Sequence, residues 1–231
     1  GGLRRLYGDA DYEALRGLRI AVVGLGGVGS WAAEALARCG VTALTLVDLD
    51  HVAESNVNRQ VQALGATLGM AKVQALRARI ADIHPACTVV AVEDFVDADN
   101  WPAVLPQPVD AVIDACDQVR AKAAMAAWAI ATRTPMVTAG AAGGKRRPQD
   151  LQVGDLASVT HDPLLASLRQ RLRREHGAAR QGSIGLPCVF SREPVRVPQG
   201  DCEIESNLNC HGYGSTVTVT ASSDWRLPSL R

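Results

Sequence analysis

Several features are scarce or missing in this sequence of 231 residues, and each absence excludes a class of protein. Lys and Arg number 24, as do Asp and Glu, so there is no excess charge of either sign. This balance argues against a protein whose whole surface coats nucleic acid, although a local basic patch remains compatible with it. No run of about 18 apolar residues is present, so no transmembrane helix is expected. None of the six cysteines form a C-x-x-C pair, the usual unit of a structural zinc site.

Composition also indicates a compartment and a size class. No segment is typical of a secretory signal, and isolated cysteines such as Cys39 and Cys116 fit reduced thiols, so we expect a cytoplasmic protein. Apolar residues make up 47% of the chain, and the length suits one α/β domain. We expect a core over 19–140, an insertion and C-terminal part over 141–222, and an atypical tail over 223–231.

Short apolar segments alternate with helical ones through the first part of the chain. Strands are expected at 19–24, 43–48, 88–92, 109–114 and 135–139. Helices are expected at 28–39, 70–83 and 118–131. This alternation predicts a Rossmann-like, doubly wound α/β fold with a mostly parallel sheet. Beyond Gly140 the chain has the composition of an irregular extension, with one helix at 162–175 that Asp162 caps.

The segment GLGGVGS follows an expected strand and opens an expected helix. Gly24, Gly26 and Gly29 satisfy the spacing G-x-G-x-x-G, and Gly27 adds a fourth glycine. Such glycines allow a tight turn, a close approach of backbone to phosphate, and close packing of helix and strand. Asp48, at the end of the second strand, can accept hydrogen bonds from a ribose. The pattern predicts an adenosine-containing ligand, either a dinucleotide or ATP, with a glycine turn that binds no ligand as the alternative.

The segment after Asp48 favours ATP. It places four polar side chains on the ligand side of an open α/β sheet: Asp50, Asn56, Arg59 and Gln60. Lys72 begins the following helix, so Arg59 and Lys72 can reach the same phosphates. A dinucleotide is usually held by backbone N–H groups, whereas a triphosphate that loses pyrophosphate needs cations for its growing charge. The alternative is that both are ordinary solvated side chains.

Two carboxylates follow the fourth expected strand in VIDACDQ. Asp114 ends the strand and Asp117 lies in the next turn. Magnesium prefers a few carboxylates together with phosphate oxygens and water, so this pair suits a magnesium ion beside a triphosphate. Capping of the next helix by Asp117 is the competing interpretation.

The motifs GLGGVGSWAAEALARCG, VDLDHVAESNVNRQ, GMAKVQ and VIDACDQVRAKAAM together resemble the ubiquitin-activating-enzyme-like, ATP-dependent adenylyltransferases. Further segments, among them DPLLASLRQRLR and CVFSREP, extend the resemblance over residues 4–222. They make the chain most similar to the members that dehydrate threonylcarbamoyladenosine in tRNA. The resemblance implies that the threonyl carboxylate attacks ATP, that pyrophosphate leaves, and that the acyl-adenylate is closed within the same side chain.

The resemblance also implies roles for individual positions. Asp48 would bind the ribose, and Asp117 would hold Mg²⁺. Arg5 is the candidate for an N-terminal arginine that reaches the ATP of the partner subunit in a homodimer. The other implied nucleotide and catalytic positions are Gly24, Gly26, Gly27, Gly29, Asp50, Asn56, Arg59 and Lys72.

Other functions stay open beside this one. The chain could instead adenylate the C-terminal glycine of a ubiquitin-like sulfur carrier, or act as a non-catalytic partner in a sulfur relay. The missing C-x-x-C pairs count against the carrier-activating members, which often bind zinc. Cys210 lies where the family has a cysteine near the active site, so it could be a nucleophile or a sulfur acceptor, while a structural role for Cys210 and for His211 is the alternative. A cysteine desulfurase or sulfur-acceptor system is a further candidate partner. An NAD-dependent oxidoreductase is disfavoured because Arg59, Lys72 and Asp117 are surplus to hydride transfer.

The expected tRNA substrate needs a docking surface. One candidate is a row of arginines around the expected helix at 162–175, in which Arg169 and Arg173 share a face. The full row is Arg169, Arg171, Arg173, Arg174 and Arg180. A second candidate is the cluster Lys145, Arg146 and Arg147; for both, a solvated charged surface is the alternative. The ending SDWRLPSLR replaces an apolar segment of the family, which bears on the expected dimer contact.

Overall fold

The computed structural model describes residues 1–195 and 213–224, and these form a seven-stranded sheet in the order β3-β2-β1-β4-β5-β7-β6. The strands are β1 Arg19–Val23, β2 Ala43–Val47, β3 Thr88–Val92, β4 Ala111–Asp114, β5 Met136–Ala139, β6 Leu151–Asp155 and β7 Pro187–Ser191. All neighbouring strands pair in parallel except β6, which is antiparallel to β7. The predicted α/β class with a mostly parallel sheet is confirmed.

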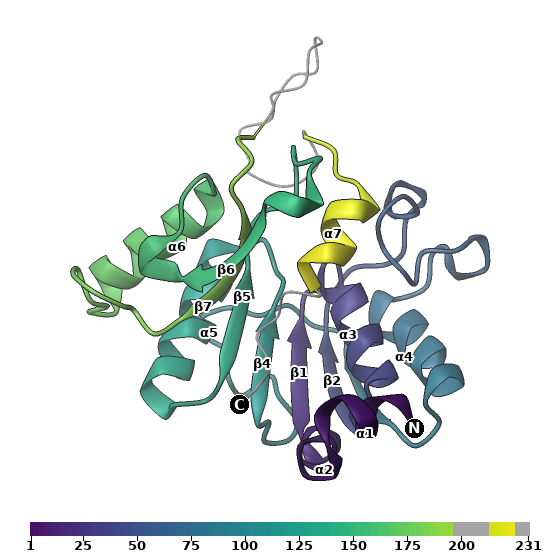
Figure 1. The fold of residues 1–231 in the computed structure, drawn as a ribbon. Helices are drawn as coiled ribbons and strands as arrows, with labels where there is room; N and C mark the ends of the chain where they lie inside the picture. The colour runs from purple at the N-terminus through teal and green to yellow at the C-terminus, as the bar shows by residue number, and fades with distance from the viewer. Residues whose placement is uncertain (196–212, 225–231) are drawn as a thin grey trace.

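Helices cover both faces of this sheet (Figure 1). They are α1 Gly2–Tyr7, α2 Asp9–Gly17, α3 Gly29–Arg38, α4 Lys72–Ile83, α5 Val119–Thr132, α6 Pro163–Glu175 and α7 Val217–Asp224. On one face α3 and α4 enclose an apolar cluster that includes Val73, Leu76 and Ile80 of α4. On the other face α5 and α6 enclose a second cluster. Because both faces are covered, β1, β2 and β4 are almost continuously apolar rather than alternating.

The region after Gly140 is more regular than its composition predicts. β7 pairs with β5, and β6 pairs with β7, so this region extends the same sheet. Asp162 caps α6 as expected, because its Oδ1 accepts the N–H of Leu165 at 2.9 Å. The segment VTVTAS, whose alternation is typical of a strand, lies in α7 and packs against α3. The expected tail therefore begins inside a helix, and 225–231 lie outside the described residues.

The strand order places the loops that matter at one edge of the sheet. The chain runs outward from β1 through β2 to β3, then returns to β4 on the other side of β1. The reversal between β1 and β4 creates a crevice at the carboxyl ends of these strands, where open α/β sheets bind ligands. α7 lies above this edge, whereas α1 and α2 lie below the opposite one (Figure 1). Within the described residues, no helix has the length and apolar character to cross a bilayer.

Candidate functional site

A cavity of about 780 Å³ opens at the carboxyl ends of β1, β2, β3, β4 and β5. Its walls come from loops that are far apart in the sequence and meet only in the folded sheet. The predicted residues that line it are Gly24, Gly26, Gly27, Asp48, Asp50, Asn56, Arg59, Gln60, Lys72 and Asp117. The structure thus brings together almost the whole predicted set.

Gly24, Gly26 and Gly29 of the turn differ in what a side chain at each position would meet. Gly24 has a φ of +85°, and a Cβ there would lie 2.7 Å from the backbone nitrogen of Cys116. A Cβ on Gly29 would lie 1.9 Å from the carbonyl oxygen of Gly24, so this glycine closes the turn and does not line the cavity. Gly26 is the opposite case, because a Cβ there would meet no heavy atom within 4 Å. Its open space belongs to the cavity, at the N-terminus of α3, where a phosphate is favoured.

Asp48 is held rigidly at the end of β2. Its Oδ2 accepts the N–H of Leu25 at 2.5 Å, and its Oδ1 accepts the N–H of Asp50 at 2.8 Å. Burial raises the pKa of Asp48, and the nearby ammonium of Lys72 only partly offsets this effect. A carboxylate has about four acceptor positions, so Asp48 keeps capacity for ribose hydroxyls.

Lys72 is the first residue of α4, as the sequence predicts, and its side chain is only 7% exposed. Its Nζ donates to Oδ2 of Asp50 at 2.7 Å and lies 3.9 Å from Oδ1 of Asp48. The two carboxylates hold the ammonium at the cavity wall.

Hydrogen bonds hold both the backbone carbonyl and the guanidinium of Arg59. The indole N–H of Trp31 donates to the Arg59 carbonyl at 3.0 Å, and the Thr220 hydroxyl lies 3.5 Å from the same oxygen. The guanidinium donates to the Ser55 carbonyl at 2.7 Å and to the Asn58 side chain at 3.0 Å. Thr220 belongs to α7, so the C-terminal helix helps to build the wall that carries Arg59.

The two carboxylates at and shortly after the end of β4, Asp114 and Asp117, lie in different surroundings. Asp114 is fully buried and does not line the cavity, which corrects the expectation that both carboxylates suit a metal. Asp117 is exposed and lines the cavity. Gln118 occupies the N-cap position of α5 with no side-chain cap, so the capping interpretation of Asp117 is wrong.

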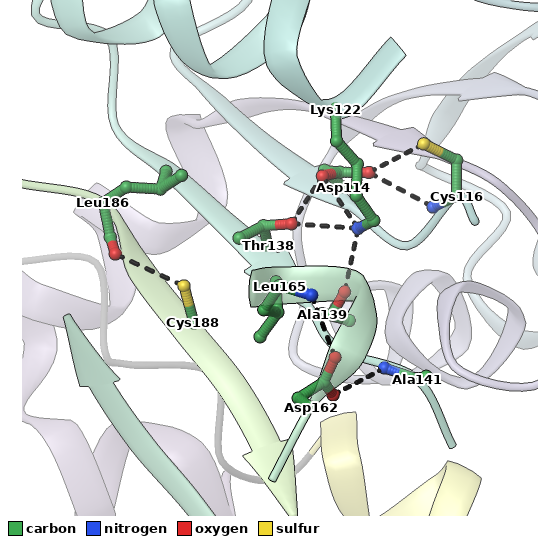
Figure 2. A network of polar contacts seen from close by, with 10 residues as sticks. All are labelled: Asp114, Cys116, Lys122, Thr138, Ala139, Ala141, Asp162, Leu165, Leu186 and Cys188. Atoms are coloured by element: carbon green, nitrogen blue, oxygen red, sulfur yellow. Dashed lines mark hydrogen bonds and ion pairs between the residues drawn. The ribbon is translucent and has the colours of Figure 1, made fainter. Parts of the chain in front are cut away.

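Figure 2 shows what Asp114 does instead. Its Oδ2 accepts from Nζ of Lys122 at 3.0 Å and from the Thr138 hydroxyl at 2.5 Å, while Oδ1 accepts the N–H of Cys116 at 3.2 Å. Nζ of Lys122 also donates to Thr138 at 2.9 Å and to the Ala139 carbonyl at 2.8 Å. Burial opposes the charge on Lys122, but the Asp114 carboxylate outweighs it and raises the pKa of the ammonium. This network joins β4, β5 and α5 beneath the cavity.

Several cavity residues carry no strong signal in the sequence. The loops after β3 and β5 contribute Asp94, Phe95, Asp97 and the range 140–142, with Phe95 55% exposed. Arg120, in the first turn of α5, also lines the cavity. What these residues share is their position in the chain, shortly after the carboxyl end of a parallel strand. That position is the feature from which they could have been predicted to line the cavity.

Three other residues singled out in the sequence do not line the described cavity or lie outside the described residues. Arg5 is exposed on α1 and does not line the cavity of its own chain. Cys210 and His211 lie outside the described residues.

In both basic clusters, side chains that were candidates for phosphate contacts donate hydrogen bonds to carbonyl oxygens of the protein. Arg169 donates to the carbonyls of Leu156 at 3.0 Å and Val159 at 2.8 Å, so it stabilises a turn rather than sharing an open phosphate-binding face. Arg173 donates to the Ala179 carbonyl at 3.0 Å. Lys145 is buried, with its ammonium donating to the carbonyls of His161 and Glu193, which excludes it as a surface contact.

The arrangement could hold ATP. The open space at Gly26, which a Cβ would fill, could take a phosphate, the Asp48 carboxylate could accept from a ribose, and Lys72 and Arg59 could contact a triphosphate. No group of three or more metal-ligating side chains occurs in the described ranges, so magnesium would depend on Asp117 and phosphate oxygens.

Comparison with known proteins identifies the family of this chain. The ThiF family profile matches residues 2–221. The chain is 43% identical to a tRNA threonylcarbamoyladenosine dehydratase of Escherichia coli, over 96% of this chain and 87% of that protein. It is 37% identical to the protein of the same name from Haemophilus influenzae, with coverage of 96% and 87%. The structure of the Escherichia coli dehydratase in complex with ATP superposes with a TM-score of 0.89, covering 97% of this chain and 88% of that one at 43% identity.

Proposed function

Because this chain belongs to the ThiF family, we propose that it uses ATP to dehydrate threonylcarbamoyladenosine in tRNA. The observation that carries the proposal is that the glycine turn, Asp48, Lys72, Arg59 and Asp117 line the same cavity. The near full-length relatives that are named dehydratases support the choice of substrate.

In this proposal, ATP binds to residues whose positions are fixed by hydrogen bonds or by the glycine turn. Asp48 accepts hydrogen bonds from the ribose. The N–H groups of the turn around Gly26 and the N-terminus of α3 bind the phosphates. Lys72 and Arg59 lie beside the phosphates, where they stabilise the charge that grows on pyrophosphate as it leaves. Asp117, together with phosphate oxygens, would hold Mg²⁺, which would neutralise part of the triphosphate charge.

The chemistry then follows from position. The threonyl carboxylate attacks the α-phosphorus of ATP, a P–O bond forms, and the bond to pyrophosphate breaks. A neighbouring nucleophilic group of the same side chain attacks the activated carbonyl carbon, loses its proton, and expels AMP. The oxygen of the lost water leaves in AMP, so the nucleoside loses one water overall. The cavity accelerates both steps by holding the reactants in line.

The proposal extends to partners. Arg5 lies on α1 and does not line the cavity of its own chain, so the role that we propose for it requires the ATP of a second subunit. A homodimer is therefore part of the proposal, and the tRNA substrate places the reaction in the cytoplasm. A cysteine desulfurase or sulfur acceptor is a further candidate partner.

Mass analysis of the modified nucleoside tests the proposal. The protein is mixed with ATP, Mg²⁺ and tRNA that carries threonylcarbamoyladenosine, and the digested nucleoside is weighed. We expect an ATP-dependent loss of one water. An unchanged nucleoside mass would refute the dehydratase. Pyrophosphate release that requires a ubiquitin-like carrier instead of tRNA would indicate the carrier-activating alternative.

A matched pair of variants tests the role of Asp117. Asp117→Ala should abolish dehydration without a change in the thermal unfolding midpoint, because the carboxylate makes no hydrogen bond to a described residue. Asp82→Ala, which removes an exposed carboxylate from α4 outside the cavity, is the control and should keep full activity. Full activity of Asp117→Ala would remove Asp117 from the magnesium site.

A further inference from the structure

Three long cationic side chains line the cavity, and two of them are engaged within the protein. Lys72 donates to Asp50 at 2.7 Å, and Arg59 donates to Ser55 and Asn58. The third is Arg120, whose exposed guanidinium makes no hydrogen bond or ion pair with any residue in 1–195 or 213–224. Arg120 is therefore available to a ligand as the protein stands.

The backbone that carries Arg120 is fixed. Arg120 lies in the first turn of α5, two residues before Lys122. Lys122 is fully buried and anchors that turn through Asp114, Thr138 and the Ala139 carbonyl (Figure 2). Its N–H also donates to the Gln118 carbonyl at 3.0 Å. The backbone of Arg120 is therefore held in place while its exposed side chain can move. A ligand in the cavity would contact a guanidinium that is carried by a rigid helix turn.

Arg120 reaches the cavity from the face of the sheet opposite to the phosphate turn. The turn leads into α3, which packs in one apolar cluster, whereas α5 packs in the cluster on the other face. Figure 1 shows α3 and α5 on opposite sides of the strands. Gly26, Lys72 and Arg59 already serve an anion on the α3 side. Arg120 adds a cation that comes from the α5 side of the same cavity.

The charge of the cavity makes such a cation necessary for a polyanionic substrate. Five carboxylates line the cavity: Asp48, Asp50, Asp94, Asp97 and Asp117. Against them stand three cations, two of which are already engaged within the protein. An RNA that inserts one nucleoside brings the two flanking phosphates towards this cavity. There Asp94, Asp97 and Asp117 have no ion pair with a described residue, so their carboxylates repel the phosphates. A guanidinium binds a phosphate through two parallel hydrogen bonds and is the side chain best suited to this task.

We propose that Arg120 contacts a backbone phosphate of the tRNA next to the modified nucleoside, and so determines affinity for the RNA but not for ATP. This inference rests on the proposed function, because it requires an RNA substrate. It differs from the sequence-based docking candidates, since Arg169 and Lys145 are committed to carbonyl oxygens.

The test compares Arg120→Ala and Arg120→Lys with wild type. Arg77→Ala is the matched control, because Arg77 is exposed on α4, outside the cavity, and its side chain makes no hydrogen bond or ion pair with a described residue. Steady-state dehydration gives KM for tRNA and kcat, titration gives the Kd for ATP, and a binding assay gives the Kd for tRNA at several salt concentrations.

We expect Arg120→Ala to raise KM and Kd for tRNA by about tenfold or more, as for a lost hydrogen bond to a charged group. The slope of log affinity against log salt should fall in magnitude by about 0.7, the value for one phosphate contact on a single strand. Arg120→Lys should recover part of the affinity and the slope. The Kd for ATP should change less than about twofold, and Arg77→Ala should match wild type in every measurement.

Three results would overturn the inference. Unchanged RNA affinity in Arg120→Ala would show that the guanidinium does not touch the tRNA. A weaker Kd for ATP would assign it to the nucleotide. A lower kcat with an unchanged salt slope would assign it to the threonyl carboxylate. If wild type binds the tRNA but does not dehydrate it, the proposed function fails, while the RNA-binding measurements still decide the role of Arg120.

Discussion

Gly26 offers the sharpest test of where the triphosphate binds, because its replacement separates stability from binding. Gly26 and Gly29 belong to the same turn, and neither has a positive φ. A methyl group on Gly26 enters open space in the cavity, whereas one on Gly29 would lie 1.9 Å from the Gly24 carbonyl oxygen. The same substitution, Gly to Ala, should therefore have opposite consequences at positions three residues apart.

The expected magnitudes follow from these distances. Gly26→Ala adds no clash and restricts the unfolded chain, so the free energy of unfolding should stay the same or rise by about 0.4–1 kcal/mol. The methyl group keeps phosphate from at least one backbone N–H. A hydrogen bond to a charged group contributes about 1.5–3 kcal/mol, so Kd for ATP should rise about 10- to 150-fold. Gly29→Ala forces backbone to move and should lower stability by about 1–3 kcal/mol or more.

Calorimetric titration with ATP and urea unfolding of the two variants provide the measurement. Wild-type affinity for ATP in a stably folded Gly26→Ala would refute the placement of phosphate at this turn. A large loss of stability in Gly26→Ala would instead show that the space beside this glycine is not open.

Other perturbations test the supports of the site. Lys122→Met leaves Asp114 buried without its partner and should lower the free energy of unfolding by about 3–5 kcal/mol in urea; a loss below about 1 kcal/mol would contradict this. Burial alone would raise the pKa of Asp155, but hydrogen bonds from Ile184, Ser183 and other donors lower it. Its stabilisation is thus present above the unfolded value of about 3.9 and lost as pH falls further. The free energy of unfolding of Asp155→Asn, measured in urea, should therefore fall less steeply with decreasing pH than that of wild type, and equal slopes would contradict this. Burial raises the pKa of Asp48, so its charged form is lost at higher pH than in an ordinary Asp. Nucleotide affinity should fall on the acid side in wild type relative to Asp48→Asn, and parallel pH profiles would contradict this.

Much of the site could be predicted from local pattern. The nucleotide site is indicated by a glycine-rich turn between an apolar strand and a helix, and by polar side chains that follow strand ends. Each of these patterns can be recognised within a short segment of the chain. This is why Gly26, Asp48, Arg59, Lys72 and Asp117 could be named from the sequence, and all five line the cavity. The strands β6 and β7 were missed, because a short edge strand and its neighbour depend on pairing partners more than on their own composition.

The sequence by itself determined the fold class and the nucleotide-binding half of the site. What only the tertiary structure decided is how each charged side chain is used. Asp114 and Asp117 look alike in the sequence, yet one is buried against Lys122 and the other faces the cavity. Arg169 and Arg120 are both helical arginines, yet one is bound to carbonyl oxygens and the other is available. The physical reason is that burial and hydrogen-bond partners come from elements distant in the chain, and these partners decide whether a charge stabilises the fold or meets a substrate.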